Sequence, residues 1–241
     1  PAFSFDPNVL EDAFRQPGVK ALILCNPSNP SGKVFTREEL TIIADLAKKY
    51  DLYVITDEVY EHILYKPHEH VYMATLPGMR ERTIICSSLS KTYSITGWRI
   101  GYVIASPDIT ERVKKVHDFL TIGAAAPLME AVVVGLNFGD EYYEELQQHY
   151  THMKELFCGG LRNIGLSFVE PQGAYYVMVD ISEFGYGNDY DFAVDLARKV
   201  GVGSVPGTSF LKEDVHDYVR FHFAKKDETL NEALNRLADI R

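Results

Sequence analysis

The sequence predicts an α/β fold, in which a mainly parallel sheet is sandwiched by helices and is followed by a small C-terminal α+β domain. In the first two thirds of the chain, short apolar runs alternate with segments of helical periodicity. Because strands that are separated by helices usually pair in parallel, this rhythm indicates a parallel α/β sheet. A long helical region follows from residue 107, and beyond it strands and helices mix without that rhythm.

The predicted strands of the sheet are short apolar runs, each followed by polar or turn-forming residues. The helix after the first strand is well marked, because Thr36 and Glu39 can form a capping box at its start. Apolar side chains then recur at helical spacing up to Tyr50, as expected for a helix that packs on a sheet. We expect the four strands at residues 21–25, 52–56, 83–87 and 100–105.

The helical region separates two bodies and has interruptions near residues 123–127 and 139–140. We therefore expect a larger domain at residues 1–125, a linking helix at residues 126–160 and a small C-terminal domain at residues 161–241. In the small domain, strand patterns occupy residues 167–170, 174–180 and 218–223, and helical patterns occupy residues 189–200 and 228–240.

The composition excludes several classes of protein. A net charge of −10 argues against a nucleic-acid groove or an anionic membrane surface, since both need clustered positive charge. No apolar stretch is long enough to cross a bilayer. The three cysteines form no Cys-x-x-Cys pair and are odd in number, so we expect neither a disulfide framework nor a metal site. Free thiols fit a reducing compartment, which favours the cytoplasm.

Polar side chains gather at the ends of the predicted strands, where open parallel sheets bind their ligands. They supply an amide, a carboxylate, a phenol, a hydroxyl, an amine and a guanidinium, which together match the needs of pyridoxal phosphate. Taken singly, several could be structural, for example as a helix cap, a packed aromatic ring or a turn residue. The residues are Asn29, Asp57, Tyr60, Ser88, Lys91 and Arg99.

Four motifs occur in a telling order: Asn-Pro-Ser-Asn-Pro-Ser-Gly at residues 26–32, Asp-Glu-Val-Tyr at 57–60, Ser-Leu-Ser-Lys at 88–91 and Thr-Gly-Trp-Arg at 96–99. Their order and spacing closely resemble those of the fold-type I pyridoxal-phosphate-dependent aminotransferases, class I/II of the aspartate aminotransferase superfamily. The resemblance covers essentially the whole chain as the C-terminal portion of such an enzyme. It implies that the predicted parallel sheet is part of the large cofactor-binding domain.

The resemblance implies a role for each matching residue. Lys91 would hold the cofactor as a Schiff base and later carry the proton of the substrate α-carbon. Asp57 would pair with the protonated pyridine nitrogen, and Tyr60 and Asn29 would hydrogen-bond the ring oxygen. The candidate catalytic residues are Lys91, Asp57 and Tyr60.

The remaining matches concern anionic groups. Ser88 and Arg99 would bind the cofactor phosphate, and Ser90 could either assist them or serve as a turn hydroxyl. Arg220 would grip the substrate α-carboxylate, with Asn29 also on the substrate side. A structural ion pair is the alternative for Arg220.

The activity implied by the resemblance is transfer of the amino group of an L-amino acid to a 2-oxo acid, with 2-oxoglutarate as the expected acceptor, in amino acid metabolism and biosynthesis. Aromatic, aspartate-like and neutral donors stay open. The alternatives are a β-lyase of cysteine conjugates and a non-catalytic interaction module of the same fold. Family members are commonly homodimers. Since the family's phosphate loop and its stacking aromatic ring lie upstream of residue 26, we expect a truncated chain that is inactive alone.

Overall fold

The chain folds into two compact units in a computed structural model, which describes residues 3–212 and 215–240. The N-terminal unit contains residues 3–27 and 34–146. The C-terminal unit contains residues 28–33 and the chain from residue 147 onward. The loop after the first strand therefore belongs to the C-terminal unit, although the segments on both sides of it belong to the other.

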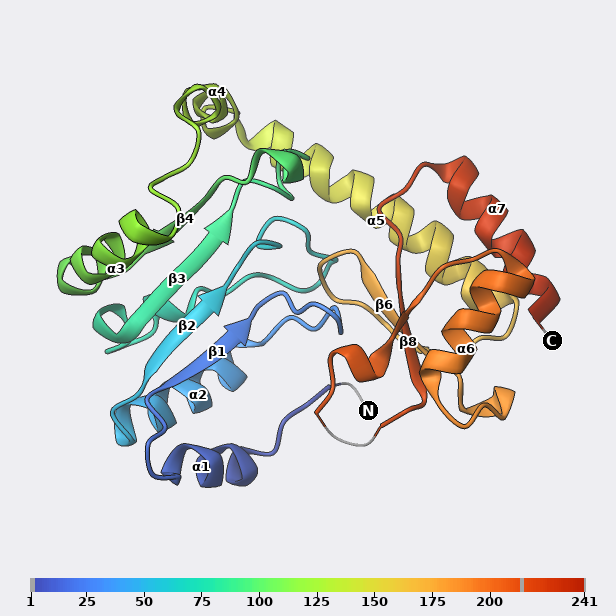
Figure 1. Cartoon of the computed structure of the whole chain (residues 1–241), viewed down its shortest axis with the longest axis horizontal. Helices are drawn as coiled ribbons and strands as arrows, with labels where there is room; N and C mark the ends of the chain where they lie inside the picture. Colours follow the sequence, from blue (N-terminus) through green and yellow to red (C-terminus); the bar gives the residue numbers. More distant parts are fainter. Residues whose placement is uncertain (1–2, 213–214, 241) are drawn as a thin grey trace. The chain divides into compact units, whose positions relative to one another are not determined.

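The N-terminal unit is built on a four-stranded sheet with the order β1-β2-β3-β4 (Figure 1). The first three strands pair in parallel, with Asp57 opposite Cys25 on one side and Cys86 on the other. The mainly parallel α/β sheet is therefore confirmed. The strands are β1 (Ala21–Cys25), β2 (Tyr53–Asp57), β3 (Thr83–Ser88) and β4 (Gly101–Ile104).

The last strand of this sheet is the exception to parallel pairing, because β4 runs antiparallel to β3. A parallel return needs a crossover of a dozen or more residues, which is usually a helix. The connection here is residues 89–100, which contain a turn and the short 3₁₀ helix Thr96–Trp98 but no α-helix. The chain therefore folds back beside β3 in the opposite direction.

Helix α2 (Arg37–Lys49) packs against this sheet and begins with the predicted capping box. The Thr36 hydroxyl accepts from the Glu39 amide at 3.2 Å, and the Glu39 carboxylate accepts from the Thr36 amide at 2.9 Å. These two bonds satisfy amides that a helix start leaves without partners. The core that α2 shares with α1 (Pro7–Arg15) and the sheet contains Phe14, Leu24, Leu40, Ile43, Ala44, Ala47, Leu52, Val54, Met73, Leu76 and Met79.

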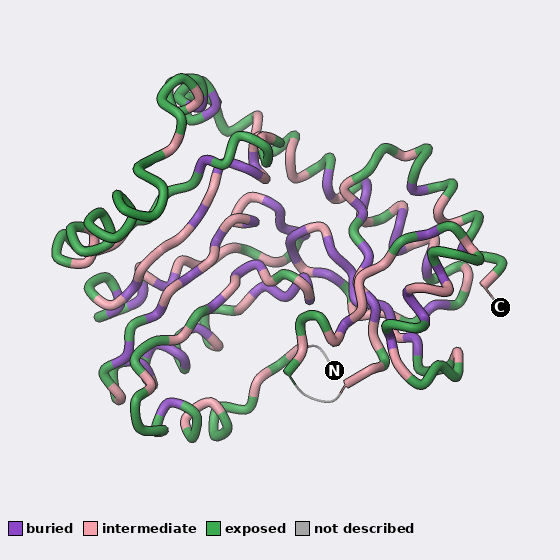
Figure 2. The backbone as a smooth tube through the Cα atoms, viewed as in Figure 1, coloured by how far each residue is buried: buried purple, intermediate pink, exposed green. Residues whose placement is uncertain are grey.

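The segment predicted as a linking helix is two helices, α4 (Ala126–Leu136) and α5 (Asp140–Asn163), preceded by α3 (Pro107–Leu120). The break falls at Gly139, close to the interruption that the sequence indicated. Figure 2 shows that α3 is exposed along most of its length. The division between the units lies within α5. Among the described residues, no helix is both long and apolar enough to span a membrane.

The C-terminal unit is α+β, with an antiparallel sheet in the order β5-β6-β8-β7. The sequence did not indicate the short edge strand β7. The predicted helix at residues 189–200 ends as a π-helix, Leu196–Val200. The elements are β5 (Phe168–Val169), β6 (Tyr176–Asp180), α6 (Asp189–Asp195), β7 (Val205–Pro206), β8 (Tyr218–His222) and α7 (Asp227–Leu237). This unit also contains the 3₁₀ helices Ser182–Phe184, Gly207–Ser209 and Ala238–Ile240. The 3₁₀ helices Met73–Thr75 and Arg80–Arg82 belong to the N-terminal unit.

Leu40 and Ile42 provide a matched test of this core, since they lie on the same helix but are 0% and 38% exposed. We expect Leu40→Ala to lower the free energy of unfolding by about 2–5 kcal/mol, because it leaves a cavity between α2 and the sheet. Ile42→Ala should lower it by less than about 1 kcal/mol. Urea denaturation followed by circular dichroism measures both. Equal losses in the two variants would contradict the packing of α2 described here.

Candidate active site

Asp57 lies at the carboxyl end of β2 and faces a cavity of about 350 Å³. The backbone amide of Val59 donates to its Oδ1 at 3.3 Å. Burial raises the pKa of Asp57 above its ordinary value, and the charge of Glu58 raises it further, whereas the Val59 hydrogen bond and the positive charge of Lys91 oppose the rise. The cost of burying the negative charge of Asp57 is thus only partly offset by its neighbours. The cavity is lined by Ile23, Ile55, Thr56, Asp57, Val59, Cys86, Ser87 and Ser88.

Lys91 sits in the turn between β3 and β4, and this turn is anchored to helix α5. The Tyr142 hydroxyl of α5 donates to the Thr92 carbonyl at 2.7 Å. The hydroxyls of Tyr93 and Tyr143 share a hydrogen bond of 2.8 Å, and the Tyr93 and Tyr142 rings stack at 5.6 Å. The two residues that follow Lys91 are therefore held by the first turn of α5. Sequence reasoning missed these tyrosines, because nothing local connects residue 93 with residues 142 and 143.

Ser88, Ser90 and Arg99 lie at the two ends of the same turn. The Ser88 hydroxyl accepts from the Ser90 amide at 3.4 Å. Arg99 has a left-handed backbone with φ 56° and ψ 45°, which is unusual for a residue other than glycine. Its Nη1 donates to the Thr96 carbonyl at 2.9 Å. A guanidinium has five N–H donors, so a phosphate could be bound in addition.

The direction of β4 decides where Arg99 lies. Gly101 pairs with Ser88 across the antiparallel ladder, so the start of β4 lies beside the end of β3. Side chains that precede β4 and follow β3 therefore share one edge of the sheet. A Cβ at Gly101 would lie 2.8 Å from the Ser87 carbonyl oxygen, so this close pairing requires glycine.

The last residue predicted for this part of the site, Tyr60, belongs to the same unit and is 4% exposed. It follows β2 by three positions, in the turn where the Ile63 amide donates to the Tyr60 carbonyl. The N-terminal unit thus contains six of the predicted residues. They are Asp57, Tyr60, Ser88, Ser90, Lys91 and Arg99.

The other two predicted residues, Asn29 and Arg220, meet within the C-terminal unit. Nη1 of Arg220 donates to Oδ1 of Asn29 at 2.6 Å. The guanidinium also lies 4.3 Å from the ring centre of Tyr176 and 4.5 Å from that of Phe210. Among the described residues, the groups that contact Arg220 in this way are an amide oxygen and two aromatic rings. None is a carboxylate, so these contacts do not support the alternative of a structural ion pair.

Two loops bring Asn29 and Phe210 to Arg220, whereas Tyr176 lies on the neighbouring strand β6. The amides of Gln172 and Gly173 both donate to the Gly32 carbonyl at 2.8 Å, which fixes the loop of Asn29. Gly32 has φ +69°, and a Cβ there would lie 2.8 Å from Cβ of Pro171, so the loop requires glycine.

The second loop carries Phe210 and is fixed by a buried acid. Asp189, which is 1% exposed, accepts from the amide of Thr208 at 2.7 Å and from its hydroxyl at 3.0 Å. Sequence reasoning gave Phe210 no role, although its motif Pro-Gly-Thr-Ser-Phe at residues 206–210 was a signal that could have found it.

A comparison with known proteins decides the family. The family model described as aminotransferase class I and II matches residues 1–237. This chain belongs to that family. Enzymes of the family use pyridoxal phosphate and catalyse amino-group transfer. The prediction that the chain belongs to the class I/II aminotransferases is therefore confirmed.

Several known aminotransferases are similar to this chain. A protein named putative aminotransferase YugH, from Bacillus subtilis, is 38% identical over 90% of the chain and 56% of its own length. Kynurenine–oxoglutarate transaminase 3 of mouse is 36% identical, over 96% of the chain and 55% of its own length. The structure of N-succinyldiaminopimelate aminotransferase from Mycobacterium tuberculosis is 34% identical and matches with a TM-score of 0.94, over 99% of this chain and 62% of the other. The aminotransferase chain thus spans little more than half the length of these relatives.

The residues of the N-terminal unit fit the family's cofactor. Asp57 is a carboxylate whose pKa is raised by burial, so a cationic ring N–H would be a favourable partner for it. Serine hydroxyls and an arginine fork at the β3–β4 turn are suitable donors for a phosphate. The donor set therefore suits pyridoxal phosphate.

The raised pKa of Asp57 gives a prediction for the chain without cofactor. Between 3.8 and the raised pKa, the folded chain keeps a proton that the unfolded chain releases, so stability falls as pH rises through this window. Asp57→Asn keeps an oxygen acceptor for Val59 and removes the charge. We expect this variant to melt at a higher temperature than the unmodified chain at pH 7, and at the same temperature at pH 3.

Asp45 provides the control, because its carboxylate is 65% exposed and pairs with Lys48. Asp45→Asn should not raise the melting temperature at pH 7. An Asp57→Asn variant that is less stable than the unmodified chain at pH 7 would rule out the described environment of Asp57.

Proposed function

We propose that this chain is the C-terminal part of an enzyme that transfers the amino group of an L-amino acid to a 2-oxo acid, with 2-oxoglutarate as the acceptor. The observation that supports this most strongly is the joint position of Lys91 and Asp57. They lie in one unit, where burial raises the pKa of the Asp57 carboxyl and the positive charge of Lys91 opposes that rise. An amine and an anion near each other at the end of a parallel sheet are what a pyridoxal phosphate site requires.

Lys91 and Asp57 would divide the chemistry. Pyridoxal phosphate, when bound, supplies an aldehyde and a ring that accepts the electrons left when a Cα–H bond breaks. Lys91 would attach the cofactor through its Nζ, and the same amine would afterwards take and return the proton of the substrate Cα. Asp57 would accept a hydrogen bond from the ring nitrogen and hold it protonated.

The other predicted residues would orient the cofactor and the substrate. Tyr60 and Asn29 would donate to the ring oxygen. Arg220 would bind the substrate α-carboxylate through two parallel hydrogen bonds, a geometry that its planar fork allows. The rings of Tyr176 and Phe210 support this role, since both lie within cation–π distance of the guanidinium. For the phosphate we propose Ser88, Ser90 and Arg99.

The range of amino-group donors proposed for this enzyme is wider than the substrates in the relatives' names. The donor is an aromatic, aspartate-like or neutral L-amino acid, and the similar proteins are named for kynurenine and for N-succinyldiaminopimelate. We further propose a homodimeric and cytoplasmic enzyme. Product analysis distinguishes transamination, which yields a new amino acid, from elimination on a cysteine conjugate, which yields pyruvate and ammonia.

Lys91→Ala tests the cofactor assignment. With added pyridoxal phosphate, the unmodified chain should give a visible absorption band, and borohydride should then fix the cofactor on the peptide that contains Lys91. Lys91→Ala should lose both, because alanine has no amine. Lys114→Ala removes a lysine of α3 that is 67% exposed and should keep both signals. A band and a fixed cofactor in Lys91→Ala would disprove the assignment.

Arg220→Lys tests the carboxylate assignment in the full-length enzyme of which this chain is proposed to be a part, loaded with cofactor. Lysine keeps the charge but loses the two-point geometry, so KM for the amino acid should rise by about 10–100-fold, which corresponds to losing one charged hydrogen bond. Steady-state kinetics with a set of amino acids measures this. Arg162→Lys is the control, since Arg162 is 63% exposed and pairs with Glu170. An unchanged KM in Arg220→Lys would exclude Arg220 as the carboxylate ligand.

A further inference from the structure

Glu61 lies four residues beyond the end of β2. Its carboxylate accepts hydrogen bonds from three hydroxyl groups on other segments of the N-terminal unit. Its Oε1 accepts from the Ser87 hydroxyl at 3.1 Å and from the Tyr102 hydroxyl at 3.1 Å. Its Oε2 accepts from the Tyr72 hydroxyl at 2.6 Å. Ser87 lies on β3 and Tyr102 on β4, where the two residues are direct partners in the antiparallel ladder. One carboxylate therefore connects both strands to the segment that follows β2.

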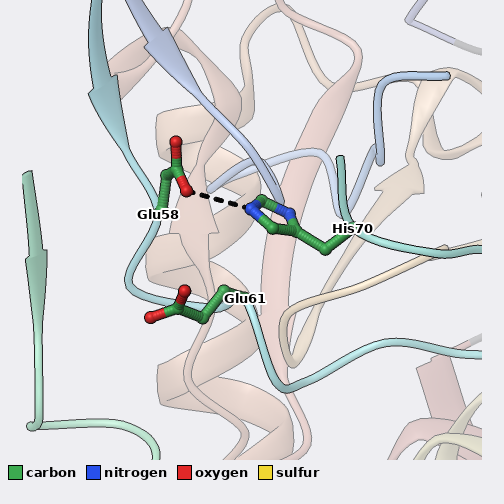
Figure 3. A group of neighbouring side chains, drawn as sticks. All are labelled: Glu58, Glu61 and His70. Atoms are coloured by element: carbon green, nitrogen blue, oxygen red, sulfur yellow. Dashed lines mark hydrogen bonds and ion pairs between the residues drawn. The ribbon is translucent and has the colours of Figure 1, made fainter. Parts of the chain in front are cut away.

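A buried acid and a histidine lie beside this carboxylate. Nε2 of His70 is 3.0 Å from Oε2 of Glu58, and their side chains are 5% and 2% exposed (Figure 3). The ring of His70 meets that of Tyr72 edge-on, with centres 4.5 Å apart. The backbone amide of Glu58 donates to the Cys86 carbonyl of β3 at 2.9 Å. We call Glu58, Glu61, His70, Tyr72, Ser87 and Tyr102 the Glu61 network.

The network is better explained as a set of mutual contacts than as a metal site. Glu58, Glu61 and His70 offer ligand atoms within 4.8 Å of one another, and zinc takes such ligands. Both oxygens of Glu61, however, already accept from hydroxyls, and Glu58 is paired with His70. Burial and the neighbouring Glu61 raise the pKa of Tyr72, so Tyr72 keeps the proton that it donates. These acids are thus satisfied by protein donors.

Members of the network are next to the site residues in the chain. Glu58 follows Asp57 directly, and Ser87 precedes Ser88 directly. Tyr102 follows Gly101, the ladder partner of Ser88. A displacement of Glu58 or Ser87 would move the adjoining site residue with it, because neighbouring residues of a strand share a rigid peptide plane. The hydrogen bonds of Glu61 therefore reach the end of β3 and the start of β4, and Glu61 itself follows the end of β2 by four residues.

We propose that Glu61 is a positioning residue, whose carboxylate holds the ends of β2 and β3 and the start of β4 in register so that Asp57 and Ser88 can receive the cofactor. Its link to the cofactor rests on the proposed function. Glu61 is distinct from the residues that would touch the cofactor. Loss of its charge leaves three hydroxyl donors without an ionic acceptor in a partly buried site, so the strand ends should loosen locally.

The first experiment measures amide hydrogen exchange in the 241-residue chain without cofactor. Glu61→Gln should speed exchange about tenfold at Glu58 and Leu89, whose amides bond to β3 and to the start of β4. At the opposite end of the sheet, the amides of Leu52 and Tyr53 should change less than about twofold. A general loss of stability would not be confined to one end.

Glu111 provides the matched control, since it is 64% exposed and pairs with Lys114 on α3. Glu111→Gln should leave all four amides unchanged. Unchanged exchange at Glu58 and Leu89 in Glu61→Gln, or equal acceleration at both ends of the sheet, overturns the inference.

The second experiment uses the absorption band that depends on Lys91. Titration with pyridoxal phosphate should give a dissociation constant about tenfold higher in Ser87→Ala than in the unmodified chain, and Ser87→Thr, which keeps the hydroxyl, should restore it. Ser87→Ala removes one of the three hydroxyls that donate to Glu61 and leaves the carboxylate in place, so it serves where Glu61→Gln folds poorly.

The outcomes of the two experiments separate the inference from the proposed function. Faster local exchange with unchanged cofactor affinity would mean that the network is structural only, which overturns a positioning role. If the unmodified chain gives no band that depends on Lys91, the proposed function of the site fails in this chain. The exchange measurement then still decides whether Glu61 holds the strand ends.

Discussion

Parallel pairing of β1, β2 and β3 is the constraint on which the N-terminal unit depends. It places the residues that follow each strand at one edge, with Asp57 level with Cys25 and Cys86. The strands are held by backbone hydrogen bonds to one another, so the polar side chains just beyond their ends are available for a ligand. The antiparallel return of β4 adds the segment of Arg99 to the same edge as the end of β3.

Several features at this edge oppose folding, as is common at functional sites. Burial of Asp57 disfavours its charged form. The left-handed backbone of Arg99 costs about 1–3 kcal/mol. These costs are offset by the core beneath α2 and by the contacts of Glu61 and α5 around the edge. The chain thus keeps unfavourable groups in fixed positions, which a binding site for a charged cofactor requires.

The C-terminal unit likewise holds a charged group in place, in this case the guanidinium of Arg220. Arg220 is held by an amide oxygen and two aromatic rings, which orient the guanidinium without neutralising its charge. A carboxylate partner would have competed with any anionic ligand. The loops of Asn29 and Phe210 are in turn fixed by hydrogen bonds to Gly32 and Asp189, so the orientation of Arg220 depends on contacts that do not involve a ligand.

The sequence by itself determined every described strand except β7, and the α2 helix with its cap, because periodicity and capping are local properties. It also determined which polar residues follow each strand, and through its motifs the family. The tertiary structure alone decided the direction of β4, since that follows from how the connection without an α-helix folds back and from pairing with β3. It alone brought Asn29 to Arg220, whose positions in the chain are 191 residues apart, and gathered Glu61 with Tyr72, Ser87 and Tyr102. These contacts join segments that share no local pattern, so only the packing of the whole unit could reveal them.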